Sequence, residues 1–395
     1  MYLLALLMGQ ILIAYSQEPK MIAIYFQLLT DFRIVKVMKH ERDGELRKMR
    51  ILWVSGRVID KDLCRTTQIA LASGLTSIGH EVTLASPGYT SDEFNFNHIS
   101  LQRSRIKGFQ SKSIANSVRQ IKPDYDIIMV DWRLAPFLQT WLNQSQLPWY
   151  LVDRGPPANS GILSSIQWRY WKRAWKMADR GMSVSNIHAD FIREKTGTNA
   201  KIDALNAGAE TGDYYSSTLN KDRPRFIYIG KVDANRDVDK LPEMVLKAGG
   251  SLKIIGSGDI FKKMDKKWKS HKDVKIVGSV SNKQVKSFLN DSDIGLLPMP
   301  DRTVWRLASP LKLAEYASAG LLVAGIEHSG NDTTFNAEWL FLAPTLEEAI
   351  VRAMNEIENN ELSETARRDA IKYFDWSIST GKLEEILHAV ITLDD

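Results

Sequence analysis

From Arg50 onward the chain repeats one unit: a short apolar run, a turn that often contains glycine, and a longer stretch with helical spacing. The first unit has an apolar run at 51–55 and a helical stretch at 65–78, and 81–85 is the next apolar run. Such alternation predicts βαβ units, in which parallel strands are joined by helical crossovers. The sequence therefore predicts an α/β fold built on parallel sheets.

The repeats fall into two series. In the first, further strands are predicted at 126–130, 149–152 and 181–185, and helices at 111–121, 162–178 and 188–196. After a polar loop at 210–223, the second series has strands at 225–229, 252–255, 274–277, 294–298 and 321–325. A chain of 395 residues is long enough for two cores. We predict two doubly wound Rossmann-like domains, at 49–208 and 222–375, with ligands in the cleft between them.

The first 48 residues lie outside this alternation. They open with a largely apolar run over 2–15, which is shorter than the roughly 20 residues that span a bilayer. The run also lacks the positively charged segment that opens a secretory signal. Because Met49 directly precedes the first predicted strand, we expect it to be the true start, with residues 1–48 outside the fold. A membrane anchor is the alternative.

Charge and cysteine content narrow the function. The formal net charge of +5 suits an anionic ligand or membrane surface, and neither it nor any motif in the chain predicts nucleic-acid binding. Cys64 is the only cysteine, which excludes an internal disulfide and favours a reducing, cytoplasmic compartment. We interpret the one Asp-x-Asp sequence, Asp237 to Asp239, as helix surface. Neither a metal nor another cofactor is expected.

Three strands of the second series end in glycine, which lets a ligand approach the backbone closely. Basic residues follow the first of them, and their side chains suit phosphate oxygens. The residues singled out at these strand ends are Gly230, Lys231, Arg236, Gly256, Gly278 and Val280.

The strongest motif opens with Ser309 and Pro310. Serine is typical of a helix N-cap and proline of the first helical position, so a helix is predicted to begin here. The amides of Leu311 and Lys312 would then form an anion site at the helix start. Glu315, about one turn later, can accept two hydroxyl hydrogen bonds, as a ribose offers. The motif predicts a site for the diphosphate and ribose of a nucleotide.

In this order the motifs at 228–231, 254–258, 278–280, 293–298 and 309–315 resemble the carboxyl-terminal half of family 4 retaining glycosyltransferases, enzymes of the GT-B fold. The resemblance implies a nucleotide-sugar donor whose diphosphate is held by Lys231 and Arg236 and whose ribose is bound by Glu315. It also implies that the loop at Gly56 lies near the donor phosphate. Trp376 resembles the aromatic residue that begins the terminal helix, which in this fold returns to the first domain; residues 376–395 are assigned to it.

The chain departs from that family at several positions. Leu307 stands where many members have a first glutamate, and Asp153 and Arg154 stand where a histidine is common. The sequence identifies no catalytic group firmly. Asp131, Asp153 and Arg154 end strands and are candidates that would face the cleft, with loop capping and ion pairing as the alternative.

The resulting expectation is a hexosyltransferase-type enzyme that transfers a sugar to a glycan or lipid-linked acceptor. A silent nucleotide-sugar-binding subunit and an epimerase stay open as alternatives. The helix at 168–177 places Trp168, Trp171 and Trp175 on one face. A second face is basic and carries Arg169, Arg173 and Lys176, with Arg180 continuing it just after the helix. That pattern fits either a core helix with a basic rim or peripheral contact with anionic lipid at the inner face of the membrane.

Overall fold

The computed structural model describes residues 47–395, apart from 60–64, 107, 158–161, 213–221, 310 and 393–395. The predicted apolar run at 2–15 lies outside the described residues. The unit described below is Met49–Asp395. Within the described ranges, no helix combines the length and the apolar character that crossing a membrane requires.

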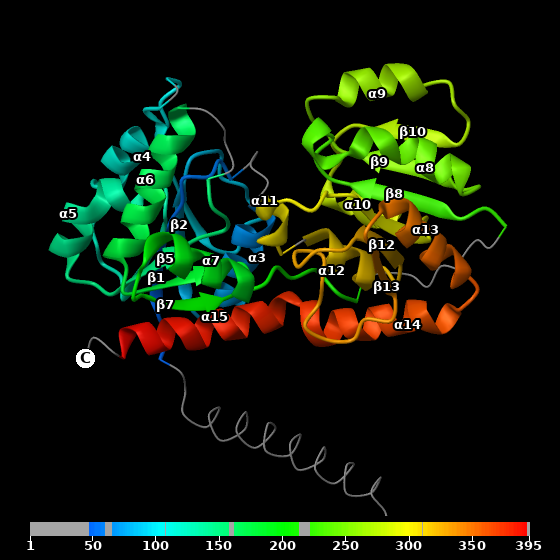
Figure 1. Cartoon of the computed structure of the whole chain (residues 1–395). Helices are drawn as coiled ribbons and strands as arrows, with labels where there is room; N and C mark the ends of the chain where they lie inside the picture. Colours follow the sequence, from blue (N-terminus) through cyan, green and yellow to red (C-terminus); the bar gives the residue numbers. More distant parts are fainter. Residues whose placement is uncertain are drawn as a thin grey trace, which may run out of the picture. The chain divides into compact units, whose positions relative to one another are not determined.

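Over the described part of the chain, the first sheet has seven parallel strands in the order β3-β2-β1-β4-β5-β6-β7. Figure 1 shows this sheet in blue to green. The strands are β1 Arg50–Val54, β2 Glu81–Ser86, β3 Asn97–Ser100, β4 Ile127–Asp131, β5 Trp149–Val152, β6 Arg180–Ser183 and β7 Lys201–Ala204. Both faces of the sheet are buried, because Leu52 packs into one apolar cluster and Trp53 into another. This is why the strands appear in the sequence as continuous apolar runs.

Helices cover both faces of this sheet. They are α3 Arg65–Ser77, α4 Gln110–Val118, α5 Ala135–Ser145, α6 Ile162–Met177 and α7 Asn186–Thr196. Helices α4 to α7 pack into one cluster, whereas α3 and the terminal helix α15, Trp376–Ile391, pack into the other. We call the first sheet with these helices the first lobe.

The second lobe is a parallel sheet in the order β10-β9-β8-β11-β12-β13 with its own apolar core. Its strands are β8 Arg225–Ile229, β9 Ser251–Ile255, β10 Val274–Val277, β11 Ile294–Leu297, β12 Leu322–Ile326 and β13 Leu340–Ala343. Its helices are α8 Leu241–Lys247, α9 Phe261–Trp268, α10 Asn282–Asn290, α11 Thr303–Arg306, α12 Leu311–Ser318, α13 Leu346–Asn355 and α14 Asn360–Asp369. Short helical turns lie at η1 Ala234–Arg236, η2 Val238–Lys240 and η3 Ala370–Phe374.

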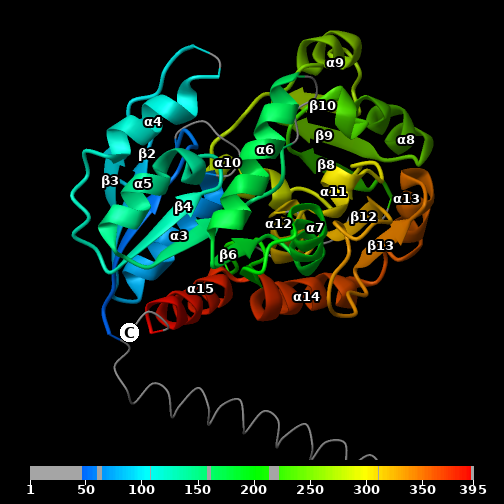
Figure 2. The ribbon, with the colours of Figure 1, turned by 60° about the vertical axis from the view of Figure 1, so that its left-hand side comes forward.

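The terminal helix α15 begins at Trp376 and packs against α3 of the first lobe (Figure 2). Gly74 makes this close packing possible, because a Cβ atom there would lie 2.3 Å from the Thr380 hydroxyl oxygen. Leu383 and Leu387 of α15 are fully buried in the first-lobe core. The end of the chain is therefore part of the first lobe in space, although it follows the second in sequence.

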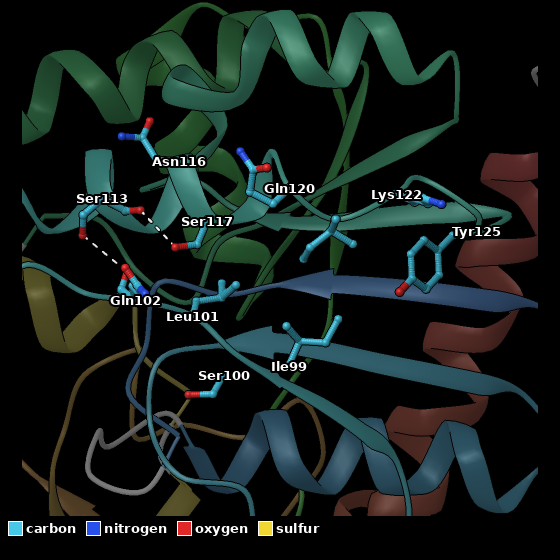
Figure 3. Close-up of a pocket in the computed structure, with 11 residues that line it drawn as sticks. Ile99, Ser100, Leu101, Gln102, Ser113, Asn116, Ser117, Gln120, Lys122 and Tyr125 are labelled. Atoms are coloured by element: carbon cyan, nitrogen blue, oxygen red, sulfur yellow. Dashed lines mark hydrogen bonds between the residues drawn. The ribbon is translucent and has the colours of Figure 1, made fainter.

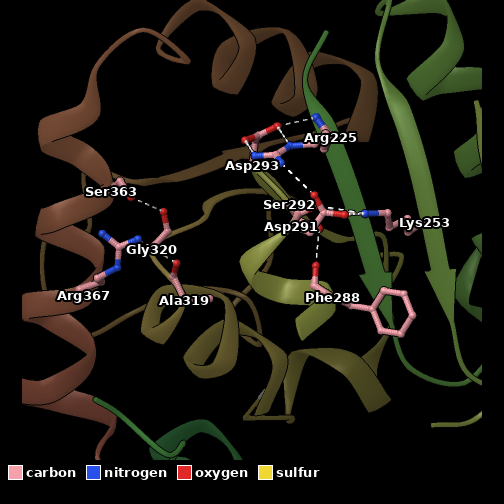
Figure 4. Close-up of polar contacts among 10 residues, drawn as sticks. All are labelled: Arg225, Lys253, Phe288, Asp291, Ser292, Asp293, Ala319, Gly320, Ser363 and Arg367. Carbon is pink, nitrogen blue, oxygen red and sulfur yellow. Dashed lines mark hydrogen bonds and ion pairs between the residues drawn. The ribbon is translucent and has the colours of Figure 1, made fainter. Parts of the chain in front are cut away.

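In both lobes, a hydrogen bond from an arginine amide to an aspartate joins neighbouring strands at the amino-terminal edge of the sheet. In the first lobe, the amide of Arg50 donates to the Asp126 carboxylate at 2.7 Å. In the second, the amide of Arg225 donates to Asp293 at 2.7 Å, and its guanidinium also pairs with that carboxylate at 2.7 Å (Figure 4). In each case the aspartate directly precedes a neighbouring strand, so the pair fixes two adjacent strands to each other.

The structure confirms the predicted pair of doubly wound α/β lobes. Helix α5 and the strands β3, β7 and β13 were not predicted from the sequence. The three strands have only four residues each, and β3, with the sequence Asn-His-Ile-Ser, has no apolar run. The placement of Arg180 on an exposed basic face was wrong: it begins β6, is 7% exposed and pairs with Asp203 at 2.7 Å.

Candidate functional site

The glycine-ended strands β10, β9 and β8 are neighbours in the second sheet, so their carboxyl ends meet at one edge. Gly256 shows how closely the turns interlock, because a Cβ atom there would lie 1.8 Å from the Gly230 carbonyl oxygen. Gly256 also has a φ of +141°, which other residues rarely adopt. Beyond β10, Gly278 and Val280 are half-buried, and Val280 packs against the second-lobe core. The structure therefore confirms the prediction that these turns lie close together.

Helix α12 is fixed to the same edge by a residue that the sequence analysis missed. The Tyr316 hydroxyl accepts a hydrogen bond from the Ile229 amide, at the end of β8, at 3.0 Å. The ring packs against Gly295 in β11, where a Cβ atom would lie 2.4 Å from it. A glycine inside an otherwise apolar strand was the available signal for this close approach. Tyr316 thereby sets the position of its neighbour Glu315.

Glu315 and Lys312 form an ion pair at 2.5 Å on the first turns of α12. Both line a small cavity of about 80 Å³ at the junction of the two lobes. Thr66 and Trp376 line the cavity from the first-lobe side, and Leu311 lines it from α12. The Ser309 hydroxyl accepts a hydrogen bond from the Ala207 amide at 3.0 Å. Pro310, which the sequence placed at the start of this helix, lies outside the described residues.

The basic pair predicted for the diphosphate lies beside the end of β8. The Lys231 carbonyl accepts a hydrogen bond from the Tyr228 hydroxyl at 2.7 Å. Burial raises the pKa of Tyr228 to about 12, and nearby Arg236 opposes that rise. The Arg236 guanidinium lies over the Trp305 ring, 4.4 Å from its centroid. Neither Lys231 nor Arg236 is among the residues that line the 80 Å³ cavity with Glu315.

Asp131 supports the first-lobe loop that contains Gly56. Its carboxylate accepts hydrogen bonds from the Gly56 amide at 3.0 Å and from the Ser55 hydroxyl at 3.1 Å. Burial raises the pKa of Asp131, while the nearby charges of Arg57 and Arg133 lower it. Asp131 therefore holds the loop at the carboxyl end of β1. This agrees with the interpretation of Asp131 as a loop cap.

Of the two interpretations left open for Asp153, the structure supports the structural one. Its side chain is fully buried and accepts hydrogen bonds from the indole nitrogens of Trp171 at 2.6 Å and Trp175 at 2.8 Å. Its other oxygen accepts from the Gly155 amide at 2.9 Å. Arg154 is half-buried and donates to the Leu205 carbonyl at 3.3 Å. These contacts tie β5 to α6 and β7, so Asp153 acts as a structural acceptor.

The same contacts show which way the tryptophan side chains of α6 face. Trp171 and Trp175 are fully buried in the first-lobe core, and Trp168 is half-buried against it. The aromatic face is thus a core face. The opposite face is exposed and basic; it carries Arg169, Lys172, Arg173 and Lys176.

Two larger cavities lie in the first lobe. One, of about 500 Å³, shares Thr66, Glu210 and Trp376 with the cavity beside Glu315, and adds the aromatic side chains of Tyr89 and Phe94. The other is an open groove of about 830 Å³ at the sheet edge, with Gln102, Ser113 and Asn116 in its lining (Figure 3). The groove shares no lining residue with the cavity beside Glu315, so of these two cavities the one of 500 Å³ adjoins the predicted donor site.

Among the described residues, one group has the composition of a metal site: His80, Glu384 and His388, whose ligand atoms lie within 4.8 Å of one another. The Met49 amide donates to Nδ1 of His80 at 3.2 Å, and Nε2 of His80 lies 2.9 Å from Glu384. In the neutral ring the proton must therefore sit on Nε2, which leaves that nitrogen no lone pair for a metal. The group is better explained as a hydrogen-bonded link between α15 and the start of β2.

Residues 215–374 match the family model for glycosyl transferases group 1. No curated protein matches this chain by sequence. These findings and the two lobes define a GT-B fold, in which residues 215–374 are similar to group 1 glycosyl transferases.

Several solved structures share the fold. Sucrose-phosphate synthase from Thermosynechococcus elongatus has a TM-score of 0.73 at 14% identity, covering 88% of this chain and 100% of that one. HepE from Anabaena, in complex with UDP and glucose, has a TM-score of 0.65 at 13% identity and covers 86% and 99%. A glycosyltransferase from Rickettsia africae has a TM-score of 0.66 at 18% identity and covers 87% and 99%.

Proposed function

We propose that this protein is a glycosyltransferase that transfers a sugar from a nucleotide-sugar donor, with retention of configuration, to a glycan or lipid-linked acceptor. The observation that carries the proposal is the placement of Glu315 and Lys312 on α12, beside the glycine-ended strands and in a cavity at the lobe junction. The group 1 match over residues 215–374 supports it, and so does the solved HepE structure, which holds UDP and glucose.

The chemistry required is stabilisation of a leaving diphosphate. As the bond between the sugar C1 and the phosphate oxygen breaks, negative charge grows on the diphosphate and positive charge on the sugar ring. Lys231, Arg236 and the start of α12 would supply fixed positive charge to the phosphates. The Glu315 carboxylate would accept hydrogen bonds from the ribose hydroxyls while Lys312 holds one of its oxygens.

The acceptor would enter from the first lobe. The 500 Å³ cavity adjoins the Glu315 cavity and is lined by Tyr89, Phe94 and Trp376. Aromatic rings stack on the apolar faces of sugar rings and pack against lipid chains, which suits a glycan or lipid-linked acceptor. The exposed basic face of α6 would contact anionic headgroups at the inner face of the membrane. Co-sedimentation with vesicles that contain anionic lipid tests that part of the proposal.

The donor site is tested by isothermal titration with UDP, GDP and ADP. We expect one of them to bind, and Glu315→Ala to weaken that binding by about tenfold or more, because it removes two charged hydrogen bonds to the ribose. Glu348→Ala is the matched control, since Glu348 pairs with Arg352 on the exposed face of α13. Unchanged affinity in Glu315→Ala would contradict the ribose role.

Leu307 is a specific reason to consider a second candidate function. It is 4% exposed and apolar where the resembling family has its first glutamate. A nucleotide-sugar-binding subunit without transferase activity would bind nucleotide but release no sugar from any donor. Mass spectrometry of a donor panel, with and without acceptors, separates that function from transfer, and proton NMR of the product reports whether configuration is retained.

A further inference from the structure

The Arg236 guanidinium lies against an aromatic ring and hydrogen-bonds the Tyr228 hydroxyl, and no carboxylate pairs with it among the described residues. The ring is that of Trp305, whose centroid is 4.4 Å from the guanidinium. The Nε atom of Arg236 is buried without a hydrogen-bond partner in that same part of the chain. A carboxylate partner would neutralise this charge, whereas a π face orients the guanidinium and leaves its charge available to an anion.

Trp305 is itself rigidly placed. It belongs to the short helix α11, packs against the second-lobe core and accepts a backbone hydrogen bond from Ala308 at 3.1 Å. Gly330 lies so close that a Cβ atom there would be 1.8 Å from the Trp305 carbonyl oxygen. The Trp305 backbone is therefore held by its neighbours and its ring packs against the core, while Arg236 ends a three-residue turn that Asp237 closes with a φ of +56°.

The segment that carries Trp305 also contacts the first lobe. The Leu307 carbonyl accepts a hydrogen bond from the Ser185 hydroxyl at 3.3 Å, and Ser309 accepts one from the Ala207 amide at 3.0 Å. The segment 305–309 thus contacts Arg236 through Trp305 and the first lobe through Leu307 and Ser309.

From this geometry we infer that Trp305 is a positioning residue, which orients the Arg236 guanidinium toward a diphosphate group. The inference rests on the proposed function, because it gives Arg236 the donor diphosphate as its ligand. It adds a residue that forms no part of the predicted donor motifs. Trp305 acts through Arg236 and does not itself touch the donor.

The test is titration of the full chain with inorganic pyrophosphate and with UDP, GDP and ADP. Trp305→Leu removes the ring, and we expect it to weaken binding of pyrophosphate and of the accepted nucleotide by the same factor, about five- to thirtyfold. Trp305→Phe keeps a π face and should stay within about threefold of the unsubstituted protein. Trp268→Leu is the control, because Trp268 carries a similar contact with Lys267 at 5.0 Å on α9.

A double-variant comparison isolates the positioning role. In an Arg236→Gln background, Trp305→Leu should cause no further loss, because the group that the ring positions is gone. Additive losses, or equal losses in Trp305→Phe and Trp305→Leu, would overturn the inference. Absence of binding by the unsubstituted protein to every probe would instead refute the proposed donor site. Thermal unfolding of each variant shows whether it remains folded.

Discussion

The Ser185 hydroxyl of the first lobe donates a hydrogen bond to the Leu307 carbonyl of the second lobe at 3.3 Å. The same hydroxyl accepts the His188 amide at 3.1 Å and so caps helix α7. One side chain therefore stabilises a helix of the first lobe and joins it to the segment just before α12. This links the first lobe to the predicted donor-binding helix.

The two roles of Ser185 can be separated by substitution. Ser185→Ala removes both the cap and the bond between the lobes, and should lower the free energy of unfolding by about 1–2 kcal/mol. Ser185→Asp keeps an acceptor for the His188 amide but has no proton to donate to Leu307. We expect it to retain most of the stability and still to weaken nucleotide binding. Urea unfolding and titration with the accepted nucleotide measure the two effects, and parallel losses in both variants would contradict this division.

Gly256 should tolerate no side chain. Gly256→Ala places a Cβ atom 1.8 Å from the Gly230 carbonyl oxygen in a backbone conformation with φ at +141°, so the turns after β8 and β9 must separate. We expect a loss of about 3 kcal/mol in unfolding free energy, together with a loss of nucleotide affinity.

Gly197→Ala is the control for backbone strain alone, because Gly197 has a φ of +61° and no atom within 4 Å of the added Cβ. It should cost about 1 kcal/mol and leave nucleotide affinity unchanged. Equal effects of the two substitutions on affinity would show that the contact between Gly256 and Gly230 is unimportant.

Asp153 should matter for stability and not for the chemical step. Asp153→Ala leaves the indole N–H groups of Trp171 and Trp175 buried without an acceptor, which should cost about 3 kcal/mol or more. Nucleotide affinity of the folded fraction should be unchanged. Denaturant unfolding and titration check the two expectations. A variant with full stability but no transfer would restore Asp153 as a catalytic candidate.

His188 should make the first lobe sensitive to acid. Burial lowers the pKa of His188 below its usual 6.5, although the nearby Asp153 charge opposes the shift. The unfolded chain therefore takes up a proton at a higher pH than the folded one, so stability falls as the pH drops below about 6.5 and levels off below the folded pKa.

Unfolding of the unsubstituted protein and of His188→Asn at pH 7.5 and pH 5.5 measures this contribution. We expect the loss of stability on acidification to be smaller in the variant. His98, His328 and His388 also have lowered pKa values, so the variant should keep part of the dependence. An identical change in both proteins would contradict the assignment to His188.

Much of the structure around the predicted donor site follows from local sequence. Apolar runs with glycine ends predict β8, β9 and β10 because parallel strands buried on both faces need continuous apolar residues. Gly320 ends α12 with a φ of +74°, as its place after the helix predicts. The supporting residues Tyr316 and Trp305 were missed, because their partners Ile229 and Arg236 lie far away in sequence.

The first lobe was harder to predict. Asp153 and Asp131 both come at strand ends, and the sequence left a place in the cleft and loop capping open for both. Only the packing of α6 shows that two indoles surround Asp153, and only the turn after β1 shows that Asp131 holds Gly56. A carboxylate at a strand end is equally suited to catalysis and to capping, so its neighbours decide its role.

The sequence by itself determined the α/β class, the two sheets with most of their strands and the glycine-ended edge of the second lobe, because these depend on periodicity and backbone conformation within short stretches. Tertiary structure alone decided which charged groups are available to a ligand. It buried Asp153 and Arg180 and placed Arg236 on Trp305. Burial and pairing depend on contacts between distant segments, and local pattern carries no information about them.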